Sequence, residues 1–160
     1  MTTAPHATLA WPDIRVGDRL SDLEIEVTPT RIVAGAIATR DFMPVHHDRA
    51  YANAQGAPDI FMNILSDTGY CSRFLTDWAG PDAMVRRIAI RLGVPLFPGS
   101  TLTYRGSVTA TYPEDGEGIV EVELRATTDL GDHVTGVAVL SLPLTGGAGP
   151  PTGPTNTEGP

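Results

Sequence analysis

The chain of 160 residues contains no lysine, so its eleven basic side chains are all arginines, against nineteen acidic ones. Without lysine, a mechanism that needs a lysine nucleophile or a Schiff base is excluded. The formal net charge of −8 argues against general binding of nucleic acid, because affinity for phosphate backbones depends mainly on dense positive charge. We therefore expect no nucleic-acid partner.

Cysteine and long apolar runs are also scarce. The single cysteine, Cys71, cannot form an internal disulfide and is typical of a small core residue in a reducing cytoplasm. No run approaches the ~18 apolar residues of a membrane helix. The start, MTTAPHATLAWPD, has neither a basic segment nor a continuous apolar one, which argues against a secretory signal. These absences predict a cytoplasmic protein that does not cross a membrane.

The composition predicts one folded domain and a tail. An apolar content of 41% over this length is ordinary for one globular core. Residues 145–160 are almost entirely Gly, Pro, Thr and other polar residues, which cannot bury enough apolar surface to offset chain entropy. We assign residues 1–144 to the domain and 145–160 to a disordered tail.

The first part of the domain predicts a strand and two helices. LEIEV (23–27) alternates like a strand. The next stretch, TPTRIVAGAIA, offers Thr28 as an N-cap with Pro29 at the first helical position. After a loop, residues 48–56 read as a short helix that is capped by Asp48.

A longer helix is predicted to begin at a cap on Asp59 and to end at Gly80. Its apolar face follows the helical period and is expected to pack in the core. The residues of that face are Ile60, Ile64, Thr68, Cys71 and Leu75.

Four runs rich in Val, Ile, Thr and Leu follow: MVRRIAIRLGV, STLTYRGSVTATY, GIVEVELRATTDL and HVTGVAVLSLPL. The turn signals PLFPG, PEDGEG and LGD separate them. We expect a four-strand antiparallel meander, and hence an α+β domain whose sheet wraps around the long helix.

The loop RDFMPVHHD (40–48) carries the clearest chemical signal. A zinc site needs at least three convergent protein ligands, and neighbouring residues on an extended chain point in opposite directions. The other histidines, His6 and His133, lie far from this loop in the sequence. We therefore expect no metal.

An acid–base pair fits the loop better. Pro44 favours a turn between Asp41 and His46 without needing a backbone donor, so both side chains can be aimed at one water molecule. Such a pair can activate the water and move its proton at neutral pH. On the pattern alone, a solvated surface loop remains the alternative.

The stretch TRDFMPVHHDRAYA resembles the hydratase signature of the MaoC-like (R-specific enoyl-CoA hydratase) family, which has the hot-dog fold. That signature runs Ser-Gly-Asp-x-Asn-Pro-(Ile/Leu/Val)-His, with Ala six residues later. Two positions depart from it, with Arg40 in place of Gly and Met43 in place of Asn. The matching positions are Asp41, Pro44, His46 and Ala52.

The resemblance extends over residues 20–142 and is closer to one branch, the small catalytic subunit of the heteromeric enoyl-CoA hydratase of actinobacterial steroid side-chain degradation. The stretches ATRDF, VHHDR, DIF, TDWAGP and RLGVP carry it. This branch implies a second, catalytically silent hot-dog chain in a heterodimer or heterotetramer. A thiolase-like aldolase is a further candidate partner.

The resemblance also implies a mechanism on an acyl-CoA substrate. Asp41 and His46 would bind and deprotonate the water that adds to a 2-enoyl-CoA. The backbone N–H of Asn63, where the family has the Gly of a His-Gly pair, would hold the thioester oxygen. No cofactor is implied, because coenzyme A is part of the substrate.

Other polar residues receive subsidiary expectations. His47 is expected to face outward or toward a partner, with a substrate contact as the alternative, and Trp78 to anchor the core or an interface. Without lysine, the phosphates of coenzyme A must be met by arginines, main-chain amides or a partner. The candidate arginines are Arg86, Arg87, Arg91 and Arg105.

Two other functions stay open. A hot-dog thioesterase would place its carboxylate on the long helix, where Asp67 and Asp77 are the candidates. A non-catalytic subunit that lends half of a tunnel to its partner would have no need of both Asp41 and His46, so their presence argues against it.

Overall fold

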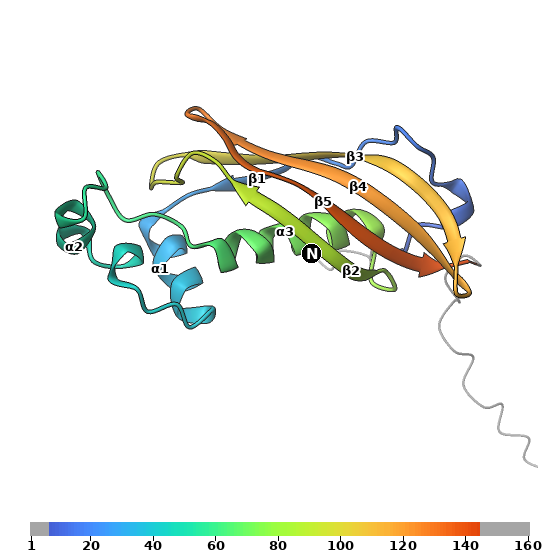
Figure 1. The fold of residues 1–160 in the computed structure, drawn as a ribbon, viewed down its shortest axis with the longest axis horizontal. Helices are drawn as coiled ribbons and strands as arrows, with labels where there is room; N and C mark the ends of the chain where they lie inside the picture. The colour runs from blue at the N-terminus through green and yellow to red at the C-terminus, as the bar shows by residue number, and fades with distance from the viewer. Residues whose placement is uncertain (1–6, 145–160) are drawn as a thin grey trace, which may run out of the picture.

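The computed structural model describes residues 7–144, so the tail predicted at 145–160 lies outside the described residues. A five-stranded antiparallel sheet lies over the long helix α3, and the shorter helices α1 and α2 lie together beyond one end of the sheet (Figure 1). The α+β class expected from the sequence is confirmed. Within residues 7–144, no helix is both long enough and apolar enough to cross a bilayer.

The elements follow the chain in a simple order. The helical segments are the 3-10 turn η1 (Trp11–Asp13), α1 (Pro29–Ala38), the 3-10 turn η2 (Pro44–His46), α2 (Arg49–Ala54) and α3 (Ile64–Ala79). The strands are β1 (Leu23–Glu26), β2 (Met84–Leu92), β3 (Thr101–Glu114), β4 (Glu117–Thr128) and β5 (Gly131–Pro143).

Two helix starts agree with the sequence analysis. The side chain of Thr28 accepts a hydrogen bond from the N–H of Arg31 at the start of α1, and Pro29 follows it. The side chain of Asp48 accepts one from the N–H of Tyr51 at the start of α2. Both caps satisfy N–H groups that the first helical turn leaves without a partner.

The strand order is β1-β3-β4-β5-β2, and every neighbouring pair is antiparallel. Hairpins join β3, β4 and β5 as expected. The β3–β4 turn is Asp115-Gly116, both with positive φ, which matches the twist of the two strands. The predicted four-strand meander is wrong, because β2 crosses over to the far side of β5 instead of pairing with β3.

The core lies between α3 and the sheet. Cys71 and Leu75 on the helix are fully buried, and the rings of Phe74 and Tyr104 lie 5.7 Å apart. On β3, Gly106 leaves room for this helix, since a Cβ there would lie 3.1 Å from the Phe74 ring. Helix and sheet therefore approach more closely at this point than a larger residue would allow.

The predicted start of α3 is wrong. The helix begins at Ile64 with Asn63 as its cap, and the predicted cap Asp59 instead pairs with Arg49 at 2.8 Å. Ile64 is 49% exposed, so the predicted apolar face holds only toward the C-terminal half of the helix. Ile60 is buried, but on a segment that precedes the helix.

That preceding segment is held away from helical geometry by bonds to other loops. The N–H of Phe61 donates to the carbonyl of Val45, and the N–H of Met62 donates to the carbonyl of Leu96, at 3.4 and 3.0 Å. These main-chain groups are therefore engaged by η2 and by the loop before β3. The segment brings the start of α3 up against the loop that follows α1.

Candidate active site

The end of α1 aims Asp41. The N–H of Arg40 donates to the carbonyl of Ile37 at 3.1 Å, and the N–H of Asp41 donates to that of Ala36 at 2.9 Å. These two bonds form a Schellman ending, which requires a left-handed residue after the last helical turn. Arg40 takes that conformation with φ of 58°, although Gly adopts it with less strain. Asp41 is thereby turned toward η2.

His46 ends η2 and is largely buried. Its Nδ1 lies 2.7 Å from the carbonyl oxygen of Phe61. Because a carbonyl only accepts, Nδ1 carries a proton, and in the neutral ring Nε2 has a free lone pair. Nε2 lies 3.4 Å from Oδ2 of Asp41, with side-chain exposures of 9% for the histidine and 26% for the aspartate. Nε2 of His46 and Oδ2 of Asp41 can thus both contact one small molecule that reaches them from the solvent.

Asn63, the cap of α3, joins this pair to two helices. Its Nδ2 donates to Oδ2 of Asp41 at 2.9 Å and to Oγ1 of Thr39 at 2.8 Å. Its Oδ1 accepts from the N–H of Ser66 at 3.1 Å. The amide therefore ties the end of α1 to the start of α3.

The surroundings keep Asp41 ionised. The hydrogen bond from the Asn63 side chain lowers the pKa of the Asp41 carboxyl, and desolvation opposes it. The N–H of Met43 and the positive potential of His46 lower this pKa further. The net direction is downward, so the carboxyl stays charged at neutral pH.

The start of α3 also offers main-chain donors. Among the described residues, the N–H of Asn63 has no hydrogen-bond acceptor. The N-terminal end of a helix carries a partial positive charge and unpaired N–H groups, which favour an anion nearby. The predicted oxyanion donor therefore lies on the same residue whose side chain contacts Asp41.

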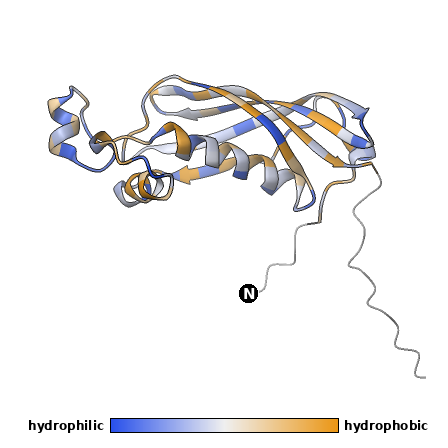
Figure 2. Ribbon diagram, turned by 60° about the horizontal axis from the view of Figure 1, so that its bottom comes forward, coloured by the Kyte–Doolittle hydropathy of each residue, from blue (hydrophilic) through white to orange (hydrophobic). Residues whose placement is uncertain are grey.

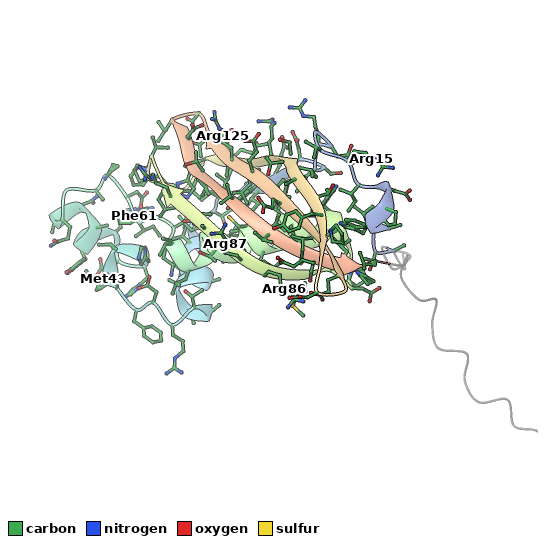
Figure 3. The ribbon with its side chains drawn as sticks, turned by 45° about the vertical axis from the view of Figure 1, so that its right-hand side comes forward. Arg15, Met43, Phe61, Arg86, Arg87 and Arg125 are labelled. Atoms are coloured by element: carbon green, nitrogen blue, oxygen red, sulfur yellow. The ribbon has the colours of Figure 1, made fainter. Side chains whose placement is uncertain are left out.

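Apolar side chains around the site face solvent in the isolated chain. Met43 and Phe61 lie at the same end of the molecule, far from Arg15 and Arg86 (Figure 3), and Figure 2 shows hydrophobic residues along α1 at this end. Scattered exposed apolar residues are normal, but a group of them around one site marks an interaction surface. The exposed group is Ile37, Phe42, Met43, Ile64 and Leu65, each 48–64% exposed.

The two thioesterase candidates are differently placed. Asp67 is fully buried, and its carboxylate lies 3.1 Å from Nε2 of His133 on β5, so it cannot reach a substrate in this structure. Asp77 is exposed near the far end of α3 and pairs with Arg73. Neither carboxylate lies with the Asp41–His46 pair.

The remaining predicted residues are dispersed. His47 is exposed, as expected, and Trp78 packs partly against the core. Two candidate arginines are engaged elsewhere: Arg86 pairs with Glu117, and Arg105 with Asp22. The other two, Arg87 and Arg91, are exposed on β2.

Two surface hollows lie away from the pair. One lies on the outer face of the sheet and the other between α1 and α3. Neither of these two hollows includes Asp41 or His46. Over residues 7–144, no cluster of three or more His, Cys, Asp or Glu side chains could hold a metal ion.

Three contributors to the site were missed from the sequence: the carbonyl of Phe61, the hydroxyl of Thr39 and the side-chain amide of Asn63. The first is a main-chain group, which carries no residue-type signal. The Asn63 amide could have been found by recognising Asn as a preferred N-cap immediately before the helix.

Residues 15–130 match the family described as MaoC like domain, so the chain belongs to the MaoC-like domain family.

One relative is the 3-oxo-4,17-pregnadiene-20-carboxyl-CoA hydratase beta subunit of Mycobacterium tuberculosis (strain ATCC 25618 / H37Rv). The two are 49% identical over 127 residues, which cover 79% of this chain and 95% of the relative.

Solved structures give the same fold. The ChsH1-ChsH2 complex from Mycobacterium tuberculosis contains a chain that matches with a TM-score of 0.75 and 49% identity, over 80% of this chain and 98% of that one. The (R)-hydratase of A. caviae involved in PHA biosynthesis matches with a TM-score of 0.74 and 25% identity, over 82% and 98%. The hot-dog fold implied by the sequence resemblance is confirmed.

Proposed function

We propose that this chain is the catalytic subunit of an enoyl-CoA hydratase, which adds water across the 2,3 double bond of a 2-enoyl-CoA. One observation carries the proposal: Oδ2 of Asp41 and Nε2 of His46 converge within 3.4 Å at a partly exposed position beside the N-terminus of α3. The membership in the MaoC-like family and the hydratase named among its relatives support it.

The pair can hold and activate water. In the neutral form, Nε2 of His46 and Oδ2 of Asp41 both accept hydrogen bonds, so one water molecule can donate a proton to each. As the water oxygen bonds to C3 of the substrate, one water proton passes to Nε2 of His46. The Asp41 carboxylate stabilises the resulting imidazolium, and this role fits its lowered pKa. The same proton then passes to C2, which completes the addition of one water molecule.

The thioester oxygen gains charge during this addition. The N–H of Asn63 lacks an acceptor among the described residues and lies at the positive end of α3, where it can meet that oxygen. No metal or cofactor is required in this scheme, because the acid–base pair and the main-chain donor supply the chemistry.

A second hot-dog chain is proposed to complete the site. A partner can cover the exposed apolar side chains beside the pair and the outer edge of β2, which has no neighbouring strand among residues 7–144. The relative's solved structure is a ChsH1-ChsH2 complex, which supports a heteromeric assembly. The relative's named substrate supports a steroid-derived acyl group. A thiolase-like partner and a cytoplasmic location belong to the same proposal, and the lone unpaired cysteine fits a reducing compartment.

The test is co-expression with a second MaoC-like chain encoded nearby, followed by assay with short-chain and steroidal enoyl-CoAs. We expect loss of the enoyl absorbance in the complex, and we expect the Asp41→Asn complex to lose this activity. Release of free coenzyme A from saturated acyl-CoA, without loss of enoyl absorbance, would instead support a thioesterase. Activity that persists in folded Asp41→Asn would refute the role of the pair.

A further inference from the structure

The side-chain amide of Asn63 has a single orientation that its neighbours permit. Its nitrogen faces two acceptors, the carboxylate of Asp41 and the hydroxyl oxygen of Thr39, whose own proton is donated to the carbonyl of Gly35 at 2.8 Å. Its oxygen faces the N–H of Ser66. A flipped amide would set oxygen against the carboxylate and NH₂ against N–H. Asn63 is only 3% exposed, so water cannot take over these bonds.

Asp41 depends on this amide more than on its other contacts. The N–H of Met43 reaches the opposite oxygen, Oδ1, at 3.3 Å, and His46 lies at 3.4 Å. The Asn63 bond is shorter, at 2.9 Å, and it is made to Oδ2, the oxygen that faces His46. The loop that carries Asp41 and His46 offers no amide side chain of its own to the carboxylate. Position 43, where the family signature has Asn, is a methionine that is 48% exposed.

We propose that the Asn63 side chain is a positioning residue, which fixes Oδ2 of Asp41 against Nε2 of His46 from outside the loop that carries both. It anchors this loop to the first turn of α3, through the cap bond to Ser66. The amide thus couples the acid–base pair to the helix end that offers the N–H of Asn63. Its effect on turnover rests on the proposed function, whereas its effect on the Asp41 carboxyl does not.

The test separates the donor from the helix cap. Asn63→Ser keeps a good cap but removes the donor to Asp41. In the assembled complex, we expect a roughly 10-fold lower kcat with little change in KM, because a hydrogen bond to a charged group is lost. The pKa of the Asp41 carboxyl should rise, since the donor that lowers it is lost. Asn63→Asp keeps the cap and adds a second carboxylate, so its shift should be larger.

Asn53→Ser is the matched control. The amide of Asn53 also donates twice, to the carbonyls of Ala57 and Pro58, but it does so at the end of α2 away from the pair. The control should lose two similar bonds and leave both kcat and the titration of Asp41 unchanged.

A second readout does not require turnover. Titration of the Asp41 side-chain carboxyl by NMR in the full isolated chain should show a higher midpoint in Asn63→Ser than in wild type, and no change in Asn53→Ser. An unchanged midpoint in Asn63→Ser would overturn the proposal, as would a rise in KM at constant kcat. If the wild-type complex hydrates no enoyl-CoA, the proposed function fails and the titration alone decides the positioning role.

Discussion

Two aspartate–histidine pairs in this chain use the same contacts. In one, Nδ1 of His46 donates to the carbonyl of Phe61, and Nε2 lies 3.4 Å from Asp41. In the other, Nδ1 of His133 donates to the carbonyl of Val94 at 2.6 Å, and Nε2 lies 3.1 Å from Asp67. A main-chain carbonyl thus fixes the protonated nitrogen in both, so that the other nitrogen faces a carboxylate.

The pairs differ in their access to solvent and in their origin along the chain. Asp41 and His46 lie on one short loop and are partly exposed. Asp67 and His133 come from α3 and β5 and are 0% and 2% exposed. His133 is the extra residue of a β-bulge, since Ala126 pairs with Val134 and Thr127 with Asp132. The bulge lets its side chain face the helix.

Water access decides what each pair can do. At the exposed pair, a water molecule can reach both acid and base from the solvent side, so proton transfer can be coupled to a reaction. At the buried pair, each charge has lost its hydration and depends on the other for compensation. The same two residue types therefore serve chemistry at one place and the stability of the helix–sheet contact at the other.

Breaking the buried pair should give the largest effect. Asp67→Ala should lower the free energy of unfolding by about 3–5 kcal/mol, because it leaves His133 buried without its partner. Replacing both residues by leucine should be far less costly, since no charge then remains buried. Denaturant unfolding measures both variants. A loss below about 1 kcal/mol in Asp67→Ala would contradict the role of this pair.

Breaking the exposed pair should affect turnover instead. Asp41→Asn or His46→Gln should lower kcat on the order of 10²-fold, because each removes one of the two groups that hold the water. The melting temperature of Asp41→Asn should change little, since that carboxyl is partly exposed and the amide has nearly the same shape. His47→Gln, at the adjacent exposed histidine, is the control and should retain wild-type kcat.

A pH titration sharpens the comparison. Burial lowers the pKa of His133, but the adjacent Asp67 carboxylate and the bond to the carbonyl of Val94 together raise it more, so the net direction is upward. A raised folded pKa gives stability that is fully present below the unfolded value of about 6.5 and lost as the pH rises through the folded value. Wild type should therefore lose stability as the pH rises from about 6.5 through the folded pKa of His133, as measured by urea unfolding. His133→Gln should not lose stability over this pH range.

The titratable side chains beside Asp67, the partner of His133, do not change their charge near neutral pH. Burial raises the pKa of the Cys71 thiol to about 11. Burial also raises the pKa of Tyr104 above its ordinary value. Neither group titrates near neutrality, so a pH slope that survives in His133→Gln would contradict the assignment.

The smallest effect is expected at the left-handed residue that precedes Asp41. Arg40→Gly should raise the free energy of unfolding by up to about 1 kcal/mol, because Gly adopts positive φ without the strain of a Cβ. Arg40→Ala keeps that strain and serves as the control. Equal stabilities of the two variants, measured by urea unfolding, would contradict the proposed strain.

The sequence predicted best what is encoded locally. The Asp41–His46 convergence follows from one short loop with a proline in it, and the β3–β4–β5 hairpins follow from short turns. The caps at Thr28 and Asp48 were predicted from residue type and position. In each case, the interacting groups are neighbours in the chain.

Contacts between residues that lie far apart in the sequence could not be predicted in the same way. The placement of β2 beside β5 depends on a crossover that no local pattern records. The early start predicted for α3 arose because Ile60 continues the helical spacing, although the main chain there is bonded to other loops. The Asp67–His133 pair needs a bulge that brings one strand residue inward, and periodicity alone does not predict it.

The lone thiol described in the core gives the chain an internal reporter. Cys71 is 0% exposed and lies on the face of α3 that packs against Tyr104. A thiol reagent therefore reacts only when α3 separates from the sheet, and no second cysteine contributes to the signal. The rate of labelling, compared with that of an unfolded chain, measures how often the helix detaches and whether a bound partner slows that detachment.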